Sequence, residues 1–127
     1  MLEGSDVTIV AEGQSVATAV KSAEILETKG IKAEVIDIRT IKPMDYDTVF
    51  KSALKTGNIF CIEENLKRGG MGEMIASEIK LRNMDIKMQI KAIEDEFVVH
   101  GSISDLNKKY GFTPEQISDD IERMLNS

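Results

Sequence analysis

Residues that could carry out chemistry are concentrated between Glu63 and Gly72. Two acidic residues end an apolar run there, two basic residues follow, and Gly69-Gly70-Met71-Gly72 opens a helical pattern. Free backbone amides and the positive end of a helix dipole could hold an anion at such a helix start. The segment matches neither the GxGxxG dinucleotide pattern nor the GxxxxGK[ST] phosphate pattern. Close packing of a helix start against a sheet is therefore the favoured interpretation.

The remaining candidates for catalysis do not assemble into an active site. Glu63 and Glu64 are adjacent in an extended segment, so their side chains diverge and cannot form a facing acid and base pair. We expect one of them to cap or brace a neighbouring loop. His100, just before a helix start, could accept a proton or contact an anionic partner, but no nucleophile lies beside it in the sequence. Cys61 lies inside an apolar run and is interpreted as a small core residue.

Composition and charge narrow the class of protein. The chain has 127 residues, of which 42% are hydrophobic and 30% charged, which favours one compact domain. Sixteen basic against 22 acidic residues give a net charge of −6, which disfavours nucleic-acid binding. No apolar stretch reaches the roughly 18 residues of a membrane span, and Met1 to Asp6 does not resemble a signal peptide. We expect a cytoplasmic protein without membrane contact. One cysteine and one histidine cannot form a zinc cluster within one chain.

Strand patterns alternate with helical patterns along the chain. We predict strands at residues 7–11, 33–38, 59–62 and 86–92, a short further strand or extended segment at 97–99, and helices at 15–29, 46–56, 71–79, 102–110 and 114–125. This alternation predicts an α/β fold with three layers, α/β/α, around a mainly parallel sheet of four to five strands. The loops at 12–15, 39–43 and 63–72 would then lie side by side at the carboxyl edge of the sheet.

Apolar periodicity predicts which side of each helix faces the sheet. The inward positions are Tyr46, Val49, Phe50, Ala53 and Leu54 in the second helix, Met71, Met74, Ile75 and Ile79 in the third, and Ile117, Ile121, Met124 and Leu125 in the last. Gly30 and Gly57 are expected to end helices in a left-handed conformation, and Thr113 to Gln116 form a capping-box pattern at the start of the last helix. The strand at 86–92 alternates apolar residues with lysines, which indicates an edge strand with one face toward water.

The order and spacing of several short motifs provide a family resemblance over almost the whole chain. Asp6 to Gly13, then Val35 to Arg39 with Lys42 to Asp45, then Ile62 to Asn65 with Gly69 to Gly72, resemble the C-terminal domain of transketolase-type thiamine diphosphate enzymes. The later segment Asp95 to Ser102, with Leu106 and Tyr110-Gly111-Phe112, is more similar to 1-deoxy-D-xylulose-5-phosphate synthases than to transketolases or to the β subunits of 2-oxoacid dehydrogenases.

The resemblance implies a supporting role in a larger enzyme. Intact relatives use thiamine diphosphate and magnesium to decarboxylate pyruvate and transfer the two-carbon unit to glyceraldehyde 3-phosphate. Two preceding domains build the cofactor site, so no cofactor is expected in this chain and the chain alone should not catalyse the reaction. The C-terminal domain packs on its neighbours and helps to shape a homodimer. The candidate interdomain or dimer interface residues are Glu63, Glu64, Asn65, Gly69, Gly70, Gly72 and His100.

Some features depart from the family and leave alternatives open. After Arg39, this chain has Thr40-Ile41 where relatives usually have Leu or Phe-Val, and this feature is shared with dehydrogenase β subunits. Ala92 to Asp95 stand where relatives have a Gly-Leu-Pro-Asp or similar turn. Relatives also have an edge strand before Glu3-Gly4, so we expect a fragment whose second strand is an exposed edge. The alternatives are part of a transketolase or dehydrogenase β subunit, or a free-standing module that binds a small anion.

Overall fold

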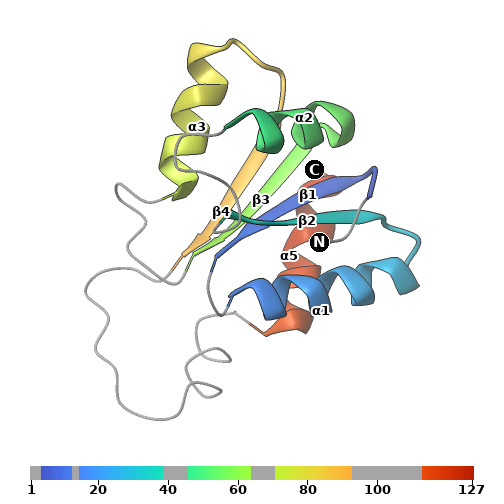
Figure 1. Ribbon diagram of the computed structural model, residues 1–127. Coiled ribbons are helices and arrows are strands. Elements are labelled where there is room, and N and C mark those ends of the chain that lie inside the picture. The colour runs from blue at the N-terminus through green and yellow to red at the C-terminus, as the bar shows by residue number, and fades with distance from the viewer. Residues whose placement is uncertain (1–3, 13–14, 39–45, 64–70, 93–112) are drawn as a thin grey trace, which may run out of the picture.

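The computed structural model describes residues 4–12, 15–38, 46–63, 71–92 and 113–127 (Figure 1). Its elements, in chain order, are β1 (Val7–Ala11), α1 (Ser15–Thr28), β2 (Ala33–Asp37), α2 (Tyr46–Thr56), β3 (Asn58–Glu63), α3 (Met71–Leu81), β4 (Lys87–Ala92) and α5 (Pro114–Leu125). The predicted strand at 97–99 and helix at 102–110 lie outside the described residues. All other predicted elements are confirmed within two residues at each end.

The four strands form one parallel sheet in the order β2-β1-β3-β4. Helices α1 and α5 cover one face of this sheet, and α2 and α3 cover the other (Figure 1). The predicted three-layer α/β/α fold is therefore confirmed. Among the strands that the structure describes, β2 and β4 are the two edges, which agrees with the edge position predicted for both.

The two central strands have almost no exposed surface. All five residues of β1 are buried, as are the last five of β3. Side chains that alternate along these strands enter two separate cores, one under α1 and α5 and the other under α2 and α3. A strand covered on both faces has a nearly continuous apolar sequence, which is the pattern seen here.

The structure corrects the inward face predicted for α2. Leu54 is 66% exposed, whereas Ser52 and Thr56 are buried. The buried hydroxyl of Thr8 in β1 lies 2.7 Å from that of Ser52 and 2.9 Å from that of Thr56. These hydrogen bonds offset the free-energy cost of burying the two hydroxyl groups, so this side of α2 can face the sheet. Apolar periodicity could not predict a helix face that is partly polar.

The inward face predicted for α3 was also partly wrong, because Met74 is 42% exposed. Ile75 is buried and Ile79 packs against the same core, as predicted, and Gly72 is buried as well. The inward stripe therefore includes a glycine, which a search for large apolar residues does not select. The stripe predicted for α5 is confirmed, with Ile117, Ile121 and Met124 buried and Leu125 partly so.

The basic face of β4 is less open to water than its sequence predicts. Lys87 and Gln89 are exposed, yet Lys87 Nζ donates a hydrogen bond of 3.0 Å to the backbone oxygen of Met124 near the end of α5. Lys91 Nζ lies 3.2 Å from Asp120 Oδ2 on the same helix. A cation beside the last carbonyls of a helix is favourable, so these lysines help to hold α5 against the edge of the sheet.

Two glycines end helices as predicted. The φ angle is +80° at Gly30 and +77° at Gly57, both in the left-handed region. Apart from the glycine and its two chain neighbours, no heavy atom lies within 4 Å of the position that a Cβ atom would occupy at either residue. Backbone conformation, and not crowding, therefore selects glycine at these positions.

We predict that Gly57→Ala lowers the free energy of unfolding by about 1 kcal/mol, because an L-residue with a Cβ is strained at positive φ. Gly57→Asn should cost less, since asparagine tolerates this conformation. Urea unfolding of the two variants and the parent chain measures the difference. Equal losses for Ala and Asn would show that something other than the backbone angle selects glycine.

A polar contact ties the exposed edge strand to α2. Lys55 Nζ lies 2.6 Å from Glu34 Oε1, and the Gly4 backbone N–H donates to the same oxygen at 3.5 Å. Burial alone would raise the pKa of Glu34. Hydrogen bonds from Lys55, Ser52 and Gly4, together with the charge of Lys55, outweigh that effect and lower the pKa below its ordinary value.

This lowered pKa predicts an acid-dependent contribution to stability. The contribution of Glu34 is complete above its ordinary pKa of 4.5 and is lost as the pH falls through the lowered value of the folded state. We expect Glu34→Gln to reduce the free energy of unfolding by at most about 1 kcal/mol at pH 7 and by much less near pH 3. Urea unfolding of both chains at the two pH values tests this, and a pH-independent difference would contradict it.

Candidate functional site

The candidate site lies at the carboxyl edge of the sheet, where β3 ends and α3 begins. Glu63 is the last residue of β3, and Gly72 lies in the first turn of α3. The structure brings these two predicted interface residues into direct contact. The other predicted interface residues, Glu64, Asn65, Gly69, Gly70 and His100, lie outside the described residues.

Glu63 binds the start of the helix that follows it. Its side chain is buried, with 1% of the residue exposed, and Glu63 Oε2 accepts a hydrogen bond of 3.1 Å from the Gly72 backbone N–H. The first amides of a helix have no partner within the helix and carry a partial positive charge. A carboxylate is a strong acceptor for them. One of the two adjacent glutamates was predicted to cap or brace a neighbouring loop; Glu63 does act as a brace, but its partner is the first turn of α3.

Gly72 permits the close approach of α3 to the sheet. A Cβ atom at this position would lie 2.8 Å from Ile90 Cδ1 and Cγ1 in β4, and 3.0 Å from Glu63 Oε2. Such separations are too short for a real side chain, so either the Ile90 side chain or the start of α3 would have to shift. The packing interpretation of the glycine-rich segment is confirmed at Gly72, and the backbone N–H there already has an acceptor within the chain.

Cys61 lies two residues before Glu63 and is completely buried. Burial raises the pKa of the Cys61 thiol strongly, and the negative charge of Glu63 adds to this effect. A thiol with a raised pKa is not ionised at neutral pH, and the thiolate is the reactive form. The interpretation of Cys61 as a core residue is confirmed.

A metal diphosphate would need a group of oxygen ligands. In the described ranges, no group of three or more His, Cys, Asp or Glu residues could hold a metal ion. The described residues therefore offer no such cluster for the divalent metal that accompanies thiamine diphosphate. Nor does any helix within the described part of the chain have the length and apolar character to cross a bilayer.

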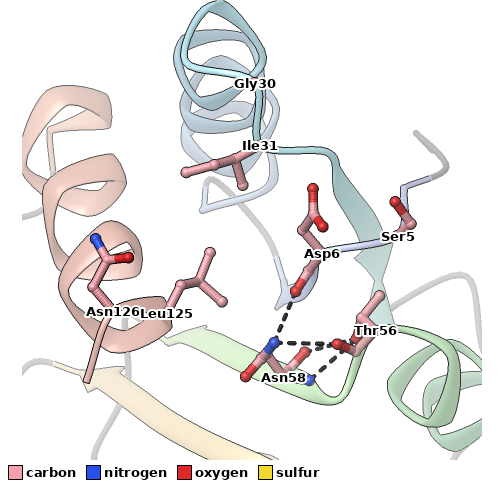
Figure 2. A pocket seen from close by; sticks show the side chains of 8 residues that line it. All are labelled: Ser5, Asp6, Gly30, Ile31, Thr56, Asn58, Leu125 and Asn126. Carbon is pink, nitrogen blue, oxygen red and sulfur yellow. Dashed lines mark hydrogen bonds between the residues drawn. The ribbon is translucent and has the colours of Figure 1, made fainter.

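A hollow of about 360 Å³ lies at the opposite, amino edge of the sheet (Figure 2). It is lined by Ser5, Asp6, Gly30, Ile31, Thr56, Asn58, Leu125 and Asn126. No motif in the sequence pointed to it, because these residues come from four separate turns and helix ends.

The polar groups of this hollow serve the fold. Asn58 Nδ2 donates hydrogen bonds to the backbone oxygens of Asp6, at 2.9 Å, and Thr56, at 3.1 Å. Asp6 Oδ2 accepts one of 2.7 Å from the Lys32 backbone N–H. These bonds align the starts of the parallel strands. Ligands of parallel α/β sheets bind at the carboxyl edge, so we do not assign a function to this hollow.

Comparison with known proteins agrees with this fold. A family model described as the C-terminal domain of transketolase matches residues 1–117. The chain is 39% identical over 116 residues to 1-deoxy-D-xylulose-5-phosphate synthase from Heliobacterium modesticaldum, covering 91% of this chain and 18% of that protein. It is 37% identical over 117 residues to one subunit of the apulose-4-phosphate transketolase from Phocaeicola vulgatus, covering 92% of this chain and 37% of that subunit.

A solved structure described as a split-gene transketolase, an inactive β4 tetramer, has the same fold. The two structures superpose with a TM-score of 0.88 at 33% sequence identity, and the alignment covers 98% of this chain and 41% of the solved chain. The chain thus spans less than half the length of the proteins that it matches here. The match of the family model to most of the chain and the parallel sheet with helices on both faces lead to one conclusion: the chain belongs to the transketolase C-terminal domain family.

Proposed function

We propose that the chain is the C-terminal, non-catalytic domain of a thiamine-diphosphate-dependent 1-deoxy-D-xylulose-5-phosphate synthase. The observation that carries this proposal is the 39% identity to such a synthase over 91% of the chain. The intact enzyme would convert pyruvate and glyceraldehyde 3-phosphate to deoxyxylulose 5-phosphate and carbon dioxide, for isoprenoid and thiamine synthesis. We place that enzyme in the cytoplasm as a homodimer, with thiamine diphosphate and magnesium held by the preceding domains.

In this proposal the domain acts as a rigid support, and its carboxyl edge faces the neighbouring domains. The contact between Glu63 and Gly72 supports a rigid edge, because it fixes the start of α3 against the sheet. Glu64, Asn65, Gly69, Gly70 and His100 belong to the same proposed interface on the basis of their motifs. The chain contributes packing surface, and the reactive groups belong to the other domains.

A second candidate is the corresponding part of a separate transketolase subunit. The 37% identity to a subunit of apulose-4-phosphate transketolase and the similarity to a split-gene transketolase favour it, since the chain covers a larger share of those proteins. In that case the cofactor-binding domains would be divided between polypeptides. The free-standing anion-binding module has less support, because the Gly72 N–H is already bonded to Glu63.

Reconstitution with the neighbouring domains tests the proposed function. We expect the chain alone to be inactive, because in the proposed enzyme the two preceding domains build the cofactor site. Joined to, or mixed with, the thiamine-diphosphate-binding domains encoded beside it, the chain should support synthesis of deoxyxylulose 5-phosphate that depends on both pyruvate and glyceraldehyde 3-phosphate. The product can be quantified by mass spectrometry.

The same assay separates the alternatives. Activity that requires a ketose phosphate donor in place of pyruvate would move the assignment to a transketolase. Turnover by the chain alone would contradict the supporting role. Omission of the chain from the mixture is the matched control, and activity that persists without it would show that the chain is dispensable.

A further inference from the structure

Glu63 is the only acidic or basic residue that is fully buried in the described part of the chain. Removing a carboxylate from water is costly unless charged partners or hydrogen bonds replace the lost hydration. At Glu63 the replacement includes the Gly72 backbone N–H, 3.1 Å from Oε2, at the positive end of the α3 dipole. An apolar residue of similar size would avoid the cost of burial, so the presence of a carboxyl group at this position needs an explanation.

Three elements meet at this carboxylate. Glu63 ends β3 and is paired in register with Ala92 of β4. Gly72 lies in the first turn of α3 and approaches both Glu63 and the Ile90 side chain of β4 so closely that a Cβ would not fit without a shift of its neighbours. The hydrogen bond therefore joins residues that are nine apart in the sequence and sets the position of the first turn of α3 relative to two strands.

We propose that Glu63 is a positioning residue for the domain interface. Its carboxylate holds the first turn of α3 against β3 and β4, and thereby sets the shape that the carboxyl edge of the sheet presents to the preceding domain of the enzyme. Glu63 is too deeply buried to meet that domain itself and acts through the Gly72 backbone. This inference rests on the proposed function, since it needs a domain that binds this edge.

Three variants separate positioning from simple stabilisation. Glu63→Ala removes the acceptor, and Glu63→Gln keeps an acceptor oxygen but removes the charge. Ile62→Val is the matched control, because Ile62 is an equally buried neighbour whose side chain enters the core under α1 and α5. That control removes one methylene and leaves the hydrogen bond to Gly72 in place.

Amide hydrogen exchange in the full chain measures the contact directly. We expect Glu63→Ala to reduce the protection of the Gly72 amide by about tenfold or more relative to that of Val10, as for loss of a charge-assisted hydrogen bond. Glu63→Gln should give a smaller reduction, and Ile62→Val should leave the ratio unchanged. A ratio that is the same in Glu63→Ala and Ile62→Val would overturn the role assigned to the carboxylate.

Binding to the preceding domains, supplied as a separate chain, measures the functional consequence. We expect Glu63→Ala to weaken association by about tenfold, Glu63→Gln to restore part of it, and Ile62→Val to stay near the parent value. Equal weakening by Glu63→Ala and Ile62→Val would reduce Glu63 to a stability role and overturn the inference. Failure of the parent chain to bind would instead overturn the proposed function, and the interface role with it.

Discussion

Burial of both faces of one parallel sheet is the constraint on which the rest of this structure depends. β1 and β3 expose almost nothing, so each face needs its own pair of helices. The apolar area removed from water on the two faces is the main favourable term in folding. Among the described residues, every buried polar side-chain atom has a hydrogen-bond partner. Thr8 lies against two hydroxyls of α2, and Glu63 lies against the start of α3.

Local signals in the sequence were sufficient to predict the architecture. Short β-branched runs, helical periodicity and glycines at helix ends predicted the order of elements and the edge position of β4. The Thr113 capping box was also predicted, and its reciprocal hydrogen bonds with Gln116 are present. Errors arose where a helix face depends on the strand beneath it. Apolar character alone predicts that Leu54 and Met74 face inward, but both are exposed. In α2 the buried positions include two hydroxyls that are hydrogen-bonded to Thr8. In α3 they include Gly72, which packs against the Ile90 side chain.

The candidate site was predictable in part. Two adjacent acids in an extended segment indicated that one would brace a neighbour, and the glycine-rich helix start indicated close packing. The sequence did not reveal that these two features form one contact, because the distance between Glu63 and Gly72 depends on the position of β4 as well as on the segment that joins them. The hollow at the amino edge was missed for a similar reason, since its residues are brought together only by the tertiary fold.

The burial of Cys61 gives the domain an internal reporter. The chain contains one cysteine, and its thiol lies in a central strand with no exposed surface. A thiol reagent can reach it only when β3 separates from its covering helices, so the rate of alkylation would follow opening of the core. No label needs to be introduced. Protection of this sulfur on assembly would therefore report how strongly neighbouring domains suppress such openings in the native polypeptide.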